Sequence, residues 1–127
     1  MQPTVLLVDD QPLPREALGA MLRAYGYSVV EVENGAAALD ALRDGLEPGL
    51  ILLDLHMDRM NGFEFRETQL GDPALAAIPV ALLSADPNLA QRAPALAIRD
   101  YLEKPVDAAA VLDLVERYCG RGERRAS

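Results

Sequence analysis

The sequence predicts an α/β protein in which five parallel strands, each followed by a helix, form one doubly wound sheet. Five apolar segments begin about 20 to 30 residues apart, and the segments between them repeat apolar residues at helical spacing. Each interval leaves room for one crossover helix, as a parallel connection requires. With 127 residues, the chain has the size of a single domain.

Three of the five apolar segments are nearly continuous rather than alternating. Continuous apolar runs are typical of parallel strands that helices cover on both faces. The expected strands are residues 4–8, 27–32, 50–55, 78–83 and 98–102.

Three of the intervening segments carry clear helix start and stop signals. The first helical repeat runs up to Gly26, the second lies between Asn34 and Gly45, and the last lies between Asp107 and Gly120. Asn and Asp are good N-cap residues, and Gly commonly follows a helix. We therefore expect helices after the first, second and fifth strands.

The other two helices have weaker patterns. The third, over residues 62–70, is only slightly amphipathic because Arg66 and Gln69 occupy positions where apolar side chains would pack. The fourth contains Pro94, which removes a backbone donor in mid-helix if the helix begins near Pro87. We expect a short or kinked fourth helix.

Composition excludes several classes of function. A net charge of −8 argues against nucleic-acid binding by this domain. The longest apolar run near the start, four residues, is too short for a signal peptide or a membrane span, so we expect a cytoplasmic protein without membrane contact. The single cysteine, Cys119, cannot form an internal disulfide and is expected near the end of the last helix. Residues 1–120 form the expected domain, and 121–127 a basic tail or the start of a linker.

Polar residues follow the predicted strands where ligands bind in such sheets. Asp9 and Asp10 end the first strand, Asp54 ends the third, Ser84 ends the fourth, and Lys104 follows the fifth. The carboxyl ends of parallel strands meet at one edge, so these side chains should lie together. Lys104 is the one lysine among 12 basic residues, the other 11 being arginine.

These residue types favour phosphoryl transfer. Three carboxylates in close quarters repel one another unless they share a cation, and hard oxygen ligands suit Mg²⁺ or Mn²⁺. Lys104 would supply a positive charge for an anion and Ser84 a hydrogen-bond donor. Asp54, on the central strand, is the best candidate nucleophile.

The motifs "LLVDD", "ILLDLHM" followed by "NG", "IPVALLSA" and "YLEKP" occur in the order seen in response-regulator receiver domains, which this sequence resembles from residue 4 to about 119. The separations from Asp10 to Asp54 (44) and from Asp54 to Ser84 (30) also fit. The resemblance implies a flavodoxin-like fold with strand order 2-1-3-4-5.

The resemblance also implies roles for the site residues. Asp54 would accept a phosphoryl group from a phosphohistidine on a histidine kinase or a phosphotransfer protein. The metal ligands would be Asp9, Asp10, Asp54 and the backbone carbonyl of His56. Ser84 and Lys104 would bind the phosphoryl oxygens. The chain would then catalyse only its own phosphorylation and slow dephosphorylation, and would not be an enzyme with a separate substrate.

A switch is implied as well. Ser84 would move towards the phosphoryl group, Tyr101 would turn inward, and the Lys104–Pro105 peptide bond is expected to be cis, which proline makes inexpensive. These changes would alter the face formed by the fourth helix, fifth strand and fifth helix. That face would signal to a downstream protein or to an output domain.

The chain departs from the family pattern at several positions. Asp58 stands where the family often has proline, and either alters metal affinity or kinase docking or is a solvent-facing turn residue. His56 and Asp86 flank the expected phosphoryl position, where a pair between them would lengthen the lifetime of the phosphorylated state; an ordinary loop histidine is the alternative. The interval from Ser84 to Lys104, 20 residues, is about two shorter than expected.

Three other functions were weighed. A haloacid-dehalogenase-like phosphohydrolase needs a second aspartate two residues after its nucleophile, where this chain has His56. A flavodoxin-like cofactor binder needs a hydroxyl-rich phosphate loop after the first strand, where this chain has "DDQPLP". A degenerate receiver that serves only as a docking module stays open, and phosphate uptake at Asp54 distinguishes it.

Overall fold

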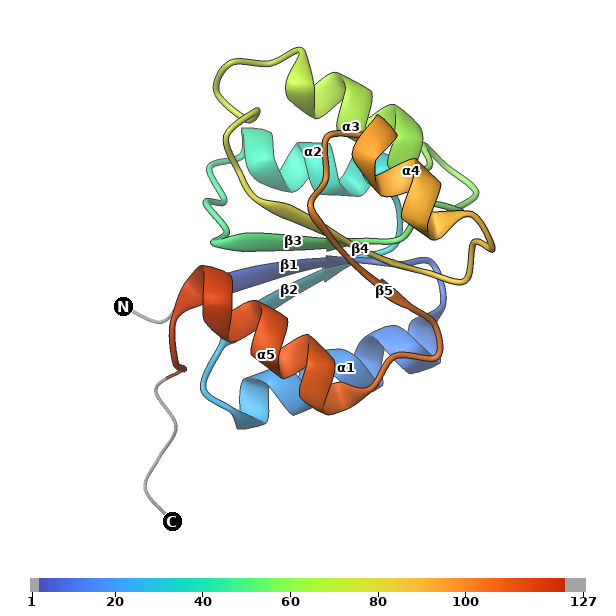
Figure 1. The fold of residues 1–127 in the computed structure, drawn as a ribbon. Helices are drawn as coiled ribbons and strands as arrows, with labels where there is room; N and C mark the ends of the chain where they lie inside the picture. Colours follow the sequence, from blue (N-terminus) through green and yellow to red (C-terminus); the bar gives the residue numbers. More distant parts are fainter. Residues whose placement is uncertain (1–2, 123–127) are drawn as a thin grey trace.

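The computed structural model describes residues 3–122, in which five parallel strands form one sheet in the predicted order β2-β1-β3-β4-β5. The strands are β1 (Thr4–Val8), β2 (Ser28–Val32), β3 (Leu50–Leu53), β4 (Val80–Ser84) and β5 (Asp100–Glu103). The helices are α1 (Pro12–Ala24), α2 (Gly35–Arg43), α3 (Gly62–Leu70), α4 (Leu89–Ala95) and α5 (Ala108–Cys119). Helices α1 and α5 cover one face of the sheet, and α2, α3 and α4 cover the other (Figure 1).

The three central strands are buried on both faces, as their continuous apolar sequences predict. Leu6 of β1 and Ile51 of β3 pack with residues of α2 and α3, whereas Leu7 and Leu52 pack with residues of α1 and α5. Alternate residues of one strand therefore belong to two separate cores. Burial of each aliphatic side chain stabilises the fold by about 1.5–3 kcal/mol. This double burial fixes the register, and with it the height at which each strand ends.

Element boundaries agree with the predictions within about two residues. Strand β3 ends at Leu53, although Leu55 beyond it is still buried, and β4 and β5 both begin two residues later than expected. The caps of α2 and α5 are Asn34 and Asp107, as predicted. Cys119 is the last residue of α5.

Gln69 of α3, which weakened the predicted amphipathic pattern, is fully buried. Its Nε2 donates to the carbonyl oxygens of Leu75 and Ile78, both at 3.0 Å, and its Oε1 accepts a bond of 2.8 Å from Arg66. Arg66 and Gln69 thus occupy buried positions of α3, as expected, and polar side chains suit these positions because the loop between α3 and β4 turns its carbonyl groups towards α3.

Arg66 of α3 forms hydrogen bonds with the backbone at the end of α4. Its guanidinium donates to the carbonyl oxygens of Leu96 (2.9 Å) and Ala97 (3.0 Å). Ala97 has φ 57°, a left-handed conformation that costs a residue with a Cβ about 1 kcal/mol. Helix α4 has seven residues, contains Pro94 and ends one residue after it, so the predicted short fourth helix is confirmed.

Two expectations concern the chain ends and membranes. Residues 123–127 of the predicted basic tail lie outside the described residues. Among the described residues, no helix combines the length and the apolar character that a membrane crossing requires.

Candidate functional site

The register of β1 and β3 brings the first two acidic strand ends together. Val8 pairs with Leu53, so Asp9 and Asp54 follow at the same height on neighbouring strands. The Asp54 N–H donates to the carbonyl of Val8 at 3.0 Å, which extends the ladder to the site itself. Both aspartates are buried. Their positions are therefore set by the sheet rather than by a mobile loop.

Three carboxylates meet at this edge. One oxygen each from Asp9, Asp10 and Asp54 lies within 4.8 Å of the others. Asp9 is further fixed by the Gln11 N–H, which donates to its Oδ1 at 3.0 Å. The grouping that strand topology predicted is present, and no other group of this kind occurs among residues 3–122.

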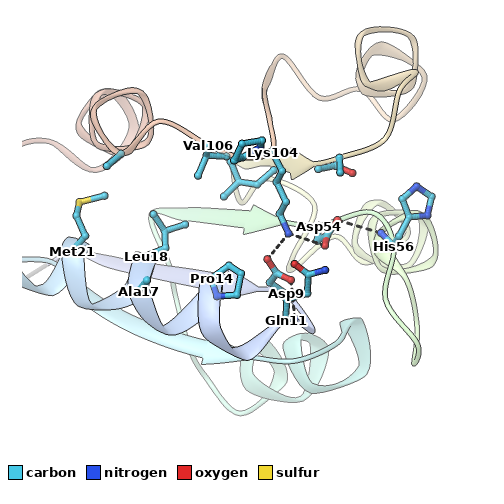
Figure 2. A pocket seen from close by; sticks show the side chains of 15 residues that line it. Asp9, Gln11, Pro14, Ala17, Leu18, Met21, Asp54, His56, Lys104 and Val106 are labelled. Carbon is cyan, nitrogen blue, oxygen red and sulfur yellow. Dashed lines mark hydrogen bonds and ion pairs between the residues drawn. The ribbon is translucent and has the colours of Figure 1, made fainter.

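Lys104 reaches into the carboxylate group from the other end of the sheet edge. Its Nζ donates to Asp9 Oδ2 at 2.6 Å and to Asp54 Oδ2 at 3.1 Å (Figure 2). Burial alone would lower the pKa of Lys104, but the bonds and charges of Asp9 and Asp54 outweigh it and raise that pKa. The ammonium is therefore held in its charged form between two acids.

The charge balance of this site fits a divalent cation. Three carboxylates and one ammonium leave a formal charge of −2 in a partly buried place. Burial raises the pKa of Asp54, and the charge of Lys104 only partly opposes this. Carboxylate oxygens in this number are the ligands that Mg²⁺ uses, together with water and substrate oxygens. The residues present therefore suit the metal.

Ser84 lies on the adjacent strand, fully buried, at the end of β4 as predicted. Its carbonyl accepts a bond from the Lys104 N–H at 2.9 Å, and its Oγ accepts one from the Asp86 N–H at 3.1 Å. Tyr101 of β5 is 39% exposed. The Lys104–Pro105 peptide bond is cis, as expected.

Gly62 allows the chain after β3 to pass close to the site. A Cβ at this position would lie 2.4 Å from the carbonyl oxygen of Asp54, closer than any real side chain approaches. The Gly62 N–H also donates to the Leu55 carbonyl at 2.9 Å. Helix α3 thus begins directly against the backbone that carries Asp54, which explains the need for glycine here.

The predicted pair between His56 and Asp86 is present, with His56 Nε2 and Asp86 Oδ2 2.7 Å apart. The bond from His56 is the main cause that lowers the pKa of Asp86, followed by the backbone N–H of Asn88. Asp58, by contrast, is exposed and lies outside the group of three carboxylates. Its effect on metal affinity or docking stays a prediction.

Sequence reasoning missed three residues around the site. Arg15 of α1 donates to the backbone carbonyl of Asp9 at 2.8 Å. Arg92 of α4 donates to Asp86 Oδ2 at 2.7 Å, and its guanidinium lies over the Phe63 ring, 5.3 Å from the centroid. The position of Arg15 in the first turn of α1, close after Asp10, is a signal that could have identified it. Nothing in the local sequence pairs Arg92 with Phe63.

A groove of about 650 Å³ leads away from the carboxylates between α1 and the segment that follows β5. Pro14, Leu18 and Met21 line one wall, and Val106 faces them from the other (Figure 2). The site thus opens onto an apolar surface large enough for another molecule to lie against.

Comparison with known proteins agrees with this geometry. Residues 5–116 match the model of the response regulator receiver domain. This chain belongs to that family. It is 33% identical over 113 residues to protein PilH of Pseudomonas aeruginosa, covering 87% of this chain and 93% of PilH. A response regulator receiver protein from Pseudomonas putida has a TM-score of 0.84 at 30% identity, covering 92% of this chain and 98% of that one.

A third receiver domain is informative about metals. The receiver domain of the sensor histidine kinase PA1611 from P. aeruginosa has a TM-score of 0.83 and 25% identity, covering 94% of this chain and 99% of that one. Its crystal structure has a magnesium ion coordinated in the active-site cleft. This chain is therefore a receiver domain of two-component signalling, and signalling rather than turnover of a substrate is the function of its family.

Proposed function

We propose that this receiver domain is an active phospho-acceptor switch and that Asp54 is the acceptor. The observation that supports this most directly is the position of the Asp54 carboxylate, buried at the end of β3, with two further carboxylates and the ammonium of Lys104 around it. A nucleophile held among charged groups that are already in position is what phosphoryl transfer requires.

In the proposed reaction an Asp54 oxygen attacks phosphorus, and the bond from phosphorus to the donor imidazole nitrogen breaks, its electron pair returning to the ring. Lys104 and the hydroxyl of Ser84 bind the phosphoryl oxygens. The residues that would hold Mg²⁺ or Mn²⁺ are Asp9, Asp10, Asp54 and, through its backbone carbonyl, His56. When bound, the metal would neutralise the charge that builds up on the phosphoryl oxygens.

The phosphodonor we propose is a histidine kinase or a phosphotransfer protein. The groove beside α1 gives such a partner an apolar surface next to Asp54. Leu13, beside the groove-lining Pro14, is 79% exposed and extends the apolar surface next to the groove. A partner that covered Leu13 would bring its phosphohistidine to the open side of the site.

The proposed output is a change in the face built from α4, β5 and α5. Ser84 would move towards the phosphoryl group, Tyr101 would turn inward, and the segment at Pro105 would hold Lys104 in position. The exposure of Tyr101 in this structure leaves that movement available. A downstream protein or an output domain would read the face. The cytoplasmic location expected from the sequence stays a prediction.

The experiment that tests this proposal is intact-mass measurement after incubation with Mg²⁺ and acetyl phosphate. We expect a gain of one phosphoryl group that is absent in Asp54→Asn and abolished by a chelator. Asp40→Asn, which changes an exposed aspartate of α2, is the matched control and should be phosphorylated normally. No gain with the unaltered protein would favour the alternative, a degenerate receiver that acts only in docking.

A further inference from the structure

The carboxylate of Asp86 joins two segments beside the phosphorylation site. Its Oδ2 lies 2.7 Å from His56 Nε2 and 2.7 Å from the Nε of Arg92 on α4. Its Oδ1 accepts a bond of 2.7 Å from the Asn88 N–H, and its own N–H donates to the Ser84 hydroxyl. With both oxygens engaged, Asp86 can hold its two partners in fixed directions.

A second contact closes these residues into a cycle. The Phe63 ring of α3 meets the His56 ring edge-on, with centroids 6.0 Å apart, and carries the Arg92 guanidinium on its face. We call the four side chains His56, Asp86, Arg92 and Phe63 the contact ring. Its members come from four segments, and the cation–π and edge-on aromatic contacts both stabilise this arrangement.

Exposure shows which member depends on the others. The side chain of Asp86 is 3% exposed, that of Arg92 40% and that of His56 60%. An imidazole with most of its surface in water has little packing to fix its rotamer. Within the described structure its orientation rests on Asp86 and on Phe63, and Arg92 contacts both of these.

The orientation of this imidazole matters because His56 lies at the mouth of the site. Its backbone N–H donates to Asp54 Oδ1 at 3.3 Å, and it lines the same groove as Asp54. In hydrolysis a water oxygen bonds to phosphorus, and the bond from phosphorus to Asp54 breaks with its electron pair returning to the carboxylate. The water protons leave to phosphate or solvent. A ring fixed at the mouth restricts the approach of that water.

We propose that Arg92, through the contact ring, fixes the His56 side chain at the mouth of the site and thereby slows hydrolysis of the phosphorylated state. Arg92 is a positioning residue in this role, since it touches neither the acceptor nor the reacting atoms. The inference rests on the proposed phosphorylation of Asp54. It goes further by assigning the lifetime of the modification to a residue of the short helix α4.

The test compares Arg92→Gln with Arg92→Lys. Each variant is phosphorylated with acetyl phosphate and Mg²⁺, the donor is removed by desalting, and the loss of the phosphoryl group is followed by intact mass. We expect Arg92→Gln to shorten the half-life about threefold or more, as loss of a partly exposed ion pair allows. Arg92→Lys, which keeps the charge, should recover most of it. Arg43→Gln, an exposed arginine at the end of α2, should match the unaltered protein.

A second readout follows the ring directly. His56 is the one histidine in the sequence, so its ring signals in an NMR spectrum need no further assignment. Relaxation measurements should show greater ring mobility on the ps–ns timescale in Arg92→Gln than in Arg92→Lys. A purely structural role for Arg92 would lower the melting temperature without this difference.

The possible results separate the inference from the proposed function. Equal half-lives for Arg92→Gln and the unaltered protein would overturn the inference and leave phosphorylation of Asp54 intact. A shortened half-life that Arg92→Lys fails to recover, with an unchanged imidazole signal and a lowered melting temperature, would also overturn it. No mass gain in any variant would overturn the proposed function and the inference together.

Discussion

Replacing Gln69 with leucine tests the buried amide of α3 with almost no change in volume. The substitution removes three hydrogen bonds: two to the carbonyls of Leu75 and Ile78, and one from an N–H of Arg66. The Leu75 carbonyl keeps the bond of 3.1 Å that it accepts from the Ile78 N–H. A buried polar group left unsatisfied costs about 1–3 kcal/mol. The Ile78 carbonyl is only partly buried and can recover water, and the Leu75 carbonyl keeps one bond, so we expect a loss of about 2–4 kcal/mol.

The assay is urea unfolding followed by circular dichroism, with the slope of the transition compared between variants. A loss of about 2–4 kcal/mol corresponds to a fall of roughly 8–16 °C in melting temperature for a domain of this size. Gln91→Leu, the same change at an exposed position of α4, should stay within about 0.5 kcal/mol. A loss below about 1 kcal/mol at Gln69 would refute the reasoning, because it would mean that the loop re-forms its bonds without the amide.

Three further predictions concern the site. Gly62→Ala should slow phosphorylation at least about tenfold, measured by mass gain over time, because the added Cβ meets the Asp54 carbonyl at 2.4 Å and displaces the acceptor. Asp54→Asn should raise the free energy of unfolding at pH 7, because a pKa raised by burial means that the ionised acid opposes folding. Stability of the unaltered protein should rise relative to the variant as pH falls from the raised pKa towards 3.8. Mg²⁺ at 100 times its dissociation constant should add about 2.7 kcal/mol to stability, and Asp10→Asn should weaken that effect.

Each of these has a result that contradicts it. Normal phosphorylation of Gly62→Ala would show that the loop after β3 shifts without moving Asp54. A pH-independent difference between Asp54→Asn and the unaltered protein would mean that burial does not control this carboxyl. Equal Mg²⁺ stabilisation in Asp10→Asn would exclude Asp10 as a ligand.

The grouping of the strand-end residues was predictable because the order and direction of the strands bring them together, independently of loop conformation. Once β1 and β3 are recognised as parallel and central, Asp9 and Asp54 must meet at the same edge whatever the loops do. The cis bond at Lys104–Pro105 and the pairing of His56 with Asp86 were expected from the resemblance to receiver domains, and both are present.

The polar network behind α3 and α4 could not be predicted in the same way. Arg66 binds carbonyl groups 30 and 31 residues further along the chain, and these groups carry no side-chain signal of their acceptor role. A search for helical periodicity expects apolar residues on the buried face, so Arg66 and Gln69 made the predicted amphipathic pattern of this helix weak. The contacts of Arg92 were not predicted for a similar reason, since they depend on where the seven-residue helix α4 begins.

Lys104 offers a practical consequence of its own. As the one lysine in the sequence, it gives the described structure a single ε-amine, and that amine lies between Asp9 and Asp54. Amine-directed reagents should therefore modify the side chains of this protein only at the proposed phosphorylation site. Because Lys104 is bonded and held charged, its acylation rate would report whether the carboxylates around it are free, metal-bound or phosphorylated. The protein thus contains its own chemical probe, and no label needs to be engineered.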